Sequence, residues 1–177
     1  MNIVAFGASS SKASINKKFA AYAASRFEHA SVEVLDFNDF IAPLFSVDEE
    51  KEEGIPQMVH GFFAKLQPAD LIIISLAEHN GSYTAAFKNT FDWASRLKVK
   101  LFEGKKLLLL STSTGQGGGK LVLESAVRRF PKHGAEIAGQ FSLPVFFENF
   151  SEERGILDAR LHKDFENILE NVRKQLC

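Results

Sequence analysis

The chain has 177 residues, of which 45% are hydrophobic and 24% charged, and its formal net charge is −1. These values are typical of one globular domain, which we expect to comprise residues 1–177. The near-neutral charge argues against a general nucleic-acid binder, because neutralising phosphates needs a concentrated basic face. It also argues against a strongly acidic electron carrier that docks on its partner by charge.

The only cysteine is Cys177, the last residue, so an intramolecular disulfide and a multi-cysteine metal site are excluded. The five histidines are scattered without ligand spacing. No apolar run approaches the roughly 20 residues that a membrane-spanning helix needs, and residues 2–4 begin a strand rather than a signal peptide. We therefore expect a cytoplasmic protein that binds no metal, no membrane and no nucleic acid.

Strands and helices alternate along the chain, as the spacing of its apolar residues indicates. Continuous apolar runs predict buried strands, whereas apolar residues three and four positions apart predict the helices that cover them. In chain order we expect strand 3–6, helix 15–27, strand 32–37, an exposed excursion 38–56, helix 56–66, strand 71–76, helix 84–96, strand 106–111, helix 121–130, strand 136–141, loop 146–157 and helix 158–177.

Most of these strands are apolar on both faces, which is typical of a parallel sheet covered by helices on each side. Five strands in this pattern predict an α/β flavodoxin-like three-layer sandwich with strand order 2-1-3-4-5. Most of the 17 phenylalanines are expected to fill its core. Phe141, Phe146, Phe147 and Phe150 are the exception, because their clustering near a sheet end indicates a pocket wall or a subunit interface.

Three polar loops follow predicted strands at the same sheet edge, where ligands bind in open α/β folds. The first contains four serines, Ser9, Ser10, Ser11 and Ser14, just before a helix. Hydroxyls, backbone N–H groups and the positive helix end together favour a phosphate, although Ser14 could also be a simple N-cap. The second loop is the turn 77–81, and the third is the glycine-rich segment 113–119. Together they predict a site for a mononucleotide with a planar head.

The loops resemble those of the NADPH-dependent FMN reductase family, the flavodoxin-like quinone, azo-dye and chromate reductases, and the resemblance covers nearly the whole chain. Residues 78–83 and 88–95 resemble the family's P-E-Y-N-G-S and L-K-N-x-x-D-W. The first loop resembles G-S-x-R-x-x-S-x-N through Ser9, Ser14 and Asn16, and the third resembles S-x-x-G-x-x-G-G. In three places the chain departs from the family: Ala77 replaces Pro, His79 replaces Tyr and Ser11 replaces Arg.

The resemblance implies non-covalently bound FMN, with NADPH or NADH as co-substrate and flavin N5 as the reacting atom, so no side chain is expected to be catalytic. Glu78 could instead be a surface carboxylate or contact a partner chain. The resemblance implies that the FMN phosphate is held by Ser9, Ser11, Ser14, Asn16 and the backbone N–H of Ile15. The ribityl chain and the flavin ring would be lined by Ala77, Glu78, His79, Asn80 and Gly81. The pyrimidine side of the ring would be met by Ser113, Gly115, Gln116 and Gly117.

The resemblance further implies an NAD(P)H-dependent reductase that passes electrons to a quinone, azo compound, flavin or similar acceptor. It also implies a homodimer or homotetramer paired through helix 84–96. Phe87 and Phe91 lie on one face of this helix and Trp93 and Leu97 on another, so one face can cover the sheet and leave the other for a partner. Trp93 itself is expected to be a structural residue. Two alternatives stay open. One is a flavodoxin-type electron carrier without NAD(P)H activity, although the T-x-T-G-x-T loop of such carriers is absent. The other is a flavin-free binding protein of the same fold.

Overall fold

The computed structural model describes residues 1–176, so the predictions made for Cys177 lie outside the described residues. Its centre is a parallel sheet of β1 (Asn2–Ala8), β2 (Ser31–Leu35), β3 (Leu71–Leu76), β6 (Lys105–Thr112) and β7 (Ala135–Leu143). The strands are ordered β2-β1-β3-β6-β7 and every neighbouring pair is parallel. This is the predicted order 2-1-3-4-5, and the flavodoxin-like fold is confirmed.

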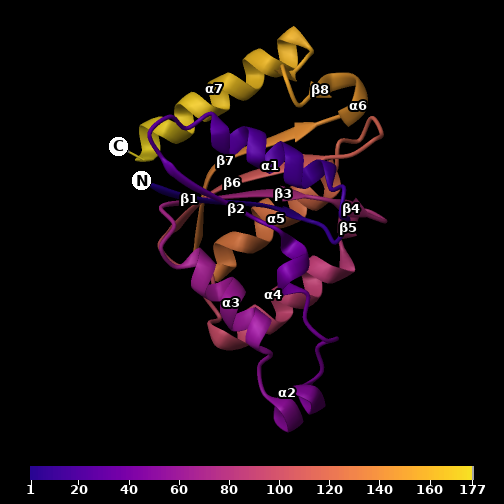
Figure 1. Ribbon diagram of the computed structural model, residues 1–177, viewed down its shortest axis with the longest axis vertical. Coiled ribbons are helices and arrows are strands. Elements are labelled where there is room, and N and C mark those ends of the chain that lie inside the picture. Colours follow the sequence, from indigo (N-terminus) through magenta and orange to yellow (C-terminus); the bar gives the residue numbers. More distant parts are fainter. Residues whose placement is uncertain (177) are drawn as a thin grey trace.

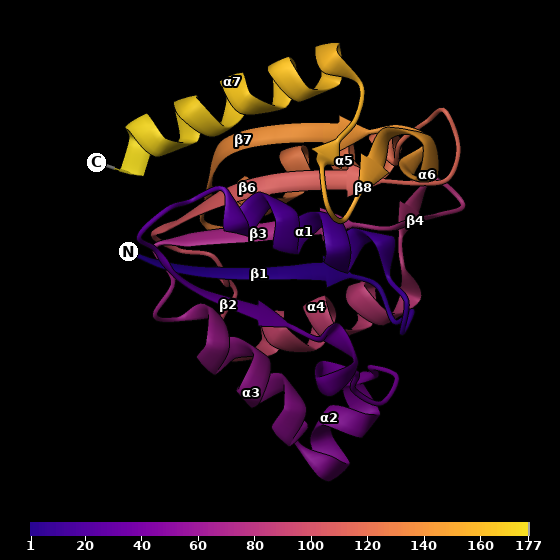
Figure 2. The ribbon, with the colours of Figure 1, turned by 45° about the horizontal axis from the view of Figure 1, so that its top comes forward.

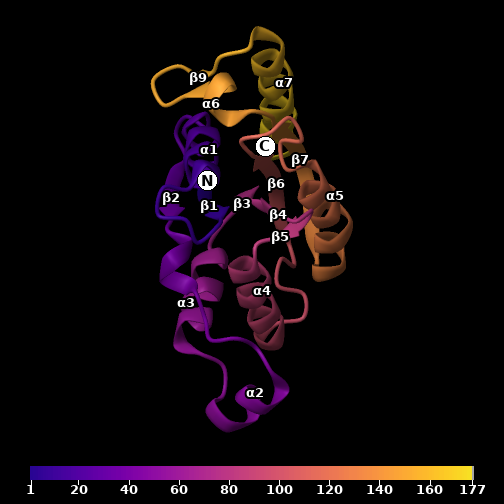
Figure 3. The same cartoon turned by 90° about the vertical axis from the view of Figure 1, so that its right-hand side faces the viewer.

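Helices cover both faces of the sheet (Figures 1 and 3). On one face lie α1 (Ile15–Ser25) and α7 (Ala159–Leu176), and on the other α3 (Gln57–Leu66), α4 (Ala85–Leu97) and α5 (Lys120–Arg129). Successive side chains of a strand point to opposite faces. In β3, Leu71 and Ile73 therefore join the core beside α1, whereas Ile72 and Ile74 join the core beside α4.

Short elements fill the connections between these layers. The turn after β3 forms a hairpin rather than a simple loop, and the predicted loop 146–157 contains a helical turn and a second hairpin. These elements are η1 (Phe37–Phe40), α2 (Val47–Glu53), β4 (Glu78–His79), β5 (Ser82–Tyr83), η2 (Phe130–His133), α6 (Phe146–Asn149), β8 (Phe150–Ser151) and β9 (Gly155–Ile156).

The phenylalanine cluster after β7 belongs mainly to the core. The Phe150 ring lies 6.1 Å from that of Phe19 on α1 and 4.8 Å from that of Phe146. Phe141 packs on Phe165 of α7 at 5.1 Å. The prediction of a subunit interface is wrong for these three residues of the cluster, because α6 and the β8–β9 hairpin fold back over α1 (Figure 3). Phe147 is 72% exposed.

The predicted excursion 38–56 is exposed only in part. Phe40 and Ala42 are buried, and the segment that follows is held by α4. The Asn89 side chain accepts a hydrogen bond from the Phe45 N–H at 2.8 Å and donates to the Ala42 carbonyl at 2.9 Å. The outer part is exposed as predicted, because α2 has no buried residue and projects from the tip of the molecule (Figure 1).

Trp93 on α4 is covered by this same segment. Its exposed fraction is 0%, its indole N–H donates to the Pro43 carbonyl at 2.8 Å, and the Phe45 ring packs against it at 4.9 Å. Trp93 is therefore the structural residue that was expected, and it is not available to a partner subunit, because the chain covers it itself. No helix within residues 1–176 has the length and hydropathy to cross a bilayer.

Candidate functional site

A cavity of about 260 Å³ lies at the carboxyl ends of β1, β3 and β6. Figure 2 shows these strand ends pointing to the same edge as the β4–β5 hairpin. All three predicted loops contribute to the cavity wall, which is the arrangement expected at the switch point of this fold. The lining residues are Ser9, Ser11, Ala13, Ser14, Ile15, Asn16, Ala77, Glu78, His79, Thr112, Ser113 and Thr114.

The first loop brings the amino end of α1 to the cavity. Ser14 is the N-cap, since its hydroxyl accepts the Lys17 N–H at 3.1 Å. The Ser9 hydroxyl accepts the Ser11 N–H at 3.2 Å, which curls the loop into a compact turn. The first turn of α1 contains no acidic residue. Three hydroxyls therefore surround a positive helix end that no carboxylate of its own neutralises, which is a suitable cradle for an anion.

Asn16 lines the cavity, but its side chain is bonded within the protein. Its side chain is 2% exposed, and its oxygen accepts the Ser75 hydroxyl at 2.7 Å and the Thr112 N–H at 3.1 Å. Its amide nitrogen donates to the Thr112 carbonyl at 3.1 Å. The Asn16 side chain thus joins α1 to the ends of β3 and β6. Its backbone N–H, in the first turn of α1, is what it offers to a ligand.

The second loop is the β4–β5 hairpin, with Asn80 and Gly81 at its tip. Their φ angles are 52° and 75°, and positive values at both central positions are typical of the type I′ turn that Asn-Gly favours. Neither tip residue lines the cavity, to which this loop contributes Ala77, Glu78 and His79. His79 is exposed, whereas Ala77 is 9% exposed. The alanine thus replaces the family's proline at a buried position.

The hairpin is tied to the first loop through Thr84, the N-cap of α4. The Thr84 hydroxyl donates to the Ala8 carbonyl at 3.1 Å and accepts the Phe87 N–H at 3.2 Å. Tyr83 packs its ring against Phe130 with centroids 6.2 Å apart. Burial raises the pKa of the Tyr83 phenol to about 12. The hairpin therefore rests on the core and is not a free flap.

The third loop is fixed at both ends. The Ser111 hydroxyl donates to the Gly118 carbonyl at 2.8 Å, and the Val145 N–H donates to the Gly115 carbonyl at 3.1 Å. Of the four residues predicted here, Ser113 lines the cavity. The other three, Gly115, Gln116 and Gly117, are exposed beyond its wall.

Gly118 and Gly119 are the glycines of this loop whose backbone has the left-handed conformation that favours glycine. Their φ angles are 60° and 76°, and a Cβ at Gly118 would meet the Ser142 hydroxyl oxygen at 2.4 Å. Gly115 and Gly117 have open space around them. The sequence interpretation emphasised these two glycines, although the close approach of the backbone occurs at the next pair.

Charges near the first loop are paired. Lys17 contacts Asp36 with 2.8 Å between its Nζ and a carboxylate oxygen. Hydrogen bonds from Lys17 and from Asn38 lower the pKa of Asp36 to about 2. The exposed Lys12 is the cation that the first loop itself contributes, in place of the family's arginine at Ser11.

Three lining residues were missed by the sequence interpretation: Ala13, Thr112 and Thr114. Strand β6 extends to Thr112, one residue beyond the predicted end, and so brings two threonines to the cavity wall. The polar run from Ser111 to Thr114 was the available signal. Within residues 1–176, no group of three or more His, Cys, Asp or Glu residues could hold a metal ion.

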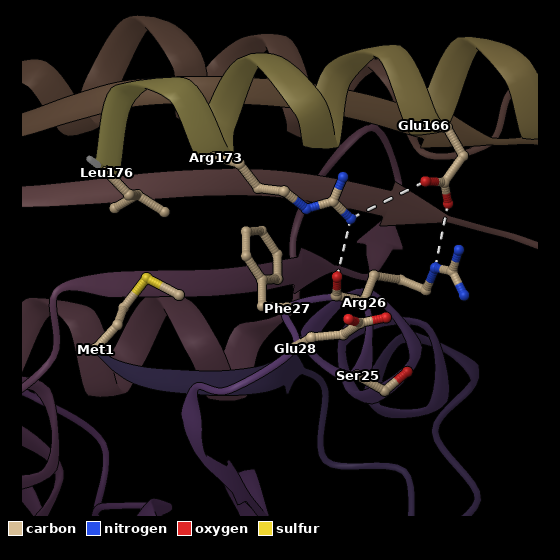
Figure 4. A pocket seen from close by; sticks show the side chains of 8 residues that line it. All are labelled: Met1, Ser25, Arg26, Phe27, Glu28, Glu166, Arg173 and Leu176. Atoms are coloured by element: carbon tan, nitrogen blue, oxygen red, sulfur yellow. Dashed lines mark hydrogen bonds and ion pairs between the residues drawn. The ribbon is translucent and has the colours of Figure 1, made fainter.

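A larger cavity, of about 550 Å³, lies at the opposite edge, near the amino end of β1 (Figure 4). Three of its charged side chains are paired: Glu166 contacts Arg26 at 3.2 Å and Arg173 at 4.0 Å. The Arg173 guanidinium also lies 5.5 Å from the centre of the Phe27 ring. No polar loop converges on this cavity as three do on the smaller one. We therefore assign the candidate site to the cavity at the carboxyl edge.

Comparison with known proteins agrees with this assignment. Residues 1–148 match the family described as NADPH-dependent FMN reductase. The quinone reductase of Escherichia coli K12 is 36% identical over 77 residues, and the match spans only 44% of this chain and 41% of that enzyme. The family match confirms the resemblance found in the sequence.

Solved structures agree on the fold. FerB, a flavoenzyme NAD(P)H:(acceptor) oxidoreductase from Paracoccus denitrificans, superposes with a TM-score of 0.73 at 20% identity, covering 98% of this chain and 97% of its own. Oxidised flavodoxin 1 from Bacillus cereus superposes with a TM-score of 0.62 at 14% identity, covering 99% of both chains. At these identities the likeness shows the flavodoxin-like fold.

Proposed function

The chain belongs to the NADPH-dependent FMN reductase family, and on this basis we propose that it is an NAD(P)H-dependent reductase that holds FMN in the cavity at the carboxyl edge. The observation that carries the proposal is the convergence of three polar loops on one cavity at the amino end of α1. Bound FMN would supply the transfer of reducing equivalents from a nicotinamide to the acceptor.

The residues present fit this cofactor. A phosphate needs hydrogen-bond donors and positive potential, which the hydroxyls of Ser9, Ser11 and Ser14 and the first N–H groups of α1 offer together. Ile15 and Asn16 contribute through their backbone N–H groups. Ala77, Glu78, His79 and Ser113 line the remaining wall and would position the ribityl chain and the ring. Asn80, Gly81, Gly115, Gln116 and Gly117 lie farther out, where they could meet the parts of the ligand that extend beyond the cavity.

We extend the proposal to the rest of the molecule. Residues 1–177 form one FMN-binding domain that acts in the cytoplasm, with NADPH or NADH as electron donor and a quinone, azo compound or flavin as acceptor. The support is the family match to the first 148 residues and the similarity to a quinone reductase. A flavodoxin-type electron carrier is the second candidate, supported by the shared fold.

Flavin binding tests the proposal directly. Protein loaded with FMN and desalted should retain a flavin spectrum near stoichiometric occupancy. Replacing Ser9 and Ser14 together by Ala should weaken FMN binding by about 1–3 kcal/mol, because charge-assisted hydrogen bonds to the phosphate are lost. Ser10→Ala is the matched control, since Ser10 is an exposed serine of the same loop outside the cavity wall. A protein that gives no calorimetric signal with FMN would leave only the flavin-free alternative.

Reduction by a nicotinamide separates the two remaining candidates. Anaerobic NADPH or NADH should bleach the flavin absorbance of the loaded protein, and a quinone should restore it. If neither nicotinamide acts faster than it does on free FMN, the electron-carrier alternative is favoured.

We also propose that the protein is a homodimer or homotetramer, as the family resemblance implies. Residues 42–45 cover α4 around Asn89 and Trp93, so an interface that includes α4 would use its other residues. Light scattering at micromolar concentration should give a multiple of the chain mass of 19.7 kDa. The mass of one chain would contradict the proposal.

A further inference from the structure

Helix α5 begins without a capping side chain of its own, because its N-cap residue is a glycine. That position is Gly119, in the left-handed conformation with a φ of 76°. A Cβ there would lie 3.0 Å from the Ser111 Cβ and 3.6 Å from the Leu76 carbonyl. The Ser, Thr, Asp or Asn residues that usually accept the first N–H groups of a helix would therefore be strained at this position.

The missing acceptor comes from the second loop. A carboxylate oxygen of Glu78 accepts the Val122 N–H at 3.0 Å. Val122 is the third residue of α5, and a side chain at the N-cap would reach this same N–H. Two other N–H groups of this first turn are bonded locally, since the Lys120 N–H donates to the Gly117 carbonyl and the Leu123 N–H donates to the Gly119 carbonyl. The carboxylate also carries the charge that a helix amino end favours.

We propose that Glu78 is a positioning residue, which caps α5 from the second loop and sets the distance between the hairpin and the third loop. A second contact connects the same elements, because a Cβ at Gly81 would lie 3.4 Å from the Leu121 Cδ1. The third loop leads directly into α5, so a shift of the helix start moves that loop. Ser113 would then leave its place in the wall.

The inference rests on the proposed function only for its effect on FMN. The hydrogen bond itself belongs to the protein alone, and it can be measured without any flavin. It also gives Glu78 a role within the protein in addition to the proposed flavin contact, because one of its carboxylate oxygens is bonded to the Val122 N–H.

Amide hydrogen exchange in the flavin-free protein tests the cap. Removing an N-cap acceptor changes stability by an amount that corresponds to about a 5- to 30-fold change in an equilibrium. Val122 should therefore exchange about 5- to 30-fold faster in Glu78→Ala, whereas Glu78→Gln should stay within about threefold of wild type because its amide oxygen accepts the same N–H. Glu124→Ala is the matched control, since Glu124 is an exposed carboxylate on α5 itself. Unchanged Val122 exchange in Glu78→Ala would overturn the inference.

FMN titration then tests the coupling to the site. Glu78→Ala should bind FMN about 5- to 10-fold more weakly than wild type, and Glu78→Gln should recover most of this loss. Faster Val122 exchange with unchanged FMN affinity would overturn the positioning role. If wild type itself fails to bind FMN, the proposed function fails, while the exchange data still decide whether Glu78 caps α5.

Discussion

Replacing Gly7 by Ala should displace the amino end of α1 from the sheet and thereby damage the anion cradle. Gly7 lies near the end of β1, directly beneath the first turn of α1. A Cβ there would lie 2.3 Å from the Lys17 N and 2.7 Å from the Asn16 C, and both atoms belong to the backbone. No change of rotamer relieves such a contact, so the helix itself must move.

The magnitude follows from these distances. Ordinary contacts begin near 3.4 Å, so the first turn of α1 must retreat by roughly 1 Å, and such overpacking costs about 1–3 kcal/mol of stability. The same movement shifts the Ser14 hydroxyl and the first N–H groups of α1 from the proposed phosphate position. Losing one charge-assisted hydrogen bond corresponds to at least about a tenfold loss of affinity. We therefore expect Gly7→Ala to lower both the free energy of unfolding and the affinity for FMN.

Gly61→Ala supplies the matched control in a different environment. Gly61 is in the middle of α3, where a Cβ would lie 3.8 Å from the nearest Phe40 ring atom. Replacing Gly by Ala in a helix stabilises it by about 1 kcal/mol, and the site should be unaffected. Urea unfolding and FMN titration of both variants complete the test. If Gly7→Ala keeps wild-type stability and affinity, the close packing of α1 on β1 is refuted.

Three further substitutions test separate features. The pKa of Asp36 is about 2 in the folded protein against 3.8 in the unfolded chain, so the stability that the Asp36 carboxylate contributes is present above pH 4 and is lost as the pH falls toward 2. Because the ion pair with Lys17 is partly exposed, Asp36→Asn should lower the free energy of unfolding by only about 1 kcal/mol at pH 7. At pH 2 the substitution should cost almost nothing, and urea unfolding at both pH values measures the difference. Tyr83→Phe removes a buried hydroxyl that has no hydrogen-bond partner within residues 1–176. Thermal unfolding should therefore show a stability equal to that of wild type or up to about 1 kcal/mol greater. A clear loss of stability would mean that the Tyr83 hydroxyl has a hydrogen-bond partner. Trp93→Phe removes the hydrogen bond to Pro43 and part of a buried ring, which should lower the free energy of unfolding in urea by about 2–4 kcal/mol. This loss should be the same at every protein concentration, whereas a role of Trp93 in a subunit interface would make it depend on concentration.

The fold could be predicted from the sequence because its signals are local and mutually consistent. Each buried strand is a continuous apolar run, and β3 is buried at all six of its residues. The first and third loops were located by polar and glycine-rich segments that directly follow such strands. These features depend on residues close in the chain, which is why periodicity alone was sufficient to place them.

The errors fall where residues distant in the chain meet. Asn89 and Trp93 are residues of one helix, and the sequence around them does not show that they hold a segment 44 to 50 residues away. Asn16 resembles a ligand residue by its spacing, but its side chain bonds to Thr112, 96 residues away. The spacing of residues along one helix does not indicate which other segment will cover it.

Two of the helix amino ends at the carboxyl edge, those of α1 and α5, explain the orientation that the proposed ligand should take. Both α1 and α5 begin there, and each start carries a partial positive charge. At α5 the Glu78 carboxylate already supplies the negative charge, whereas α1 is capped by the neutral hydroxyl of Ser14 and has no acid in its first turn. A phosphate therefore gains most at α1 and is repelled near Glu78. The uncharged ring is left to the wall formed by the hairpin and the third loop, whose spacing Glu78 sets.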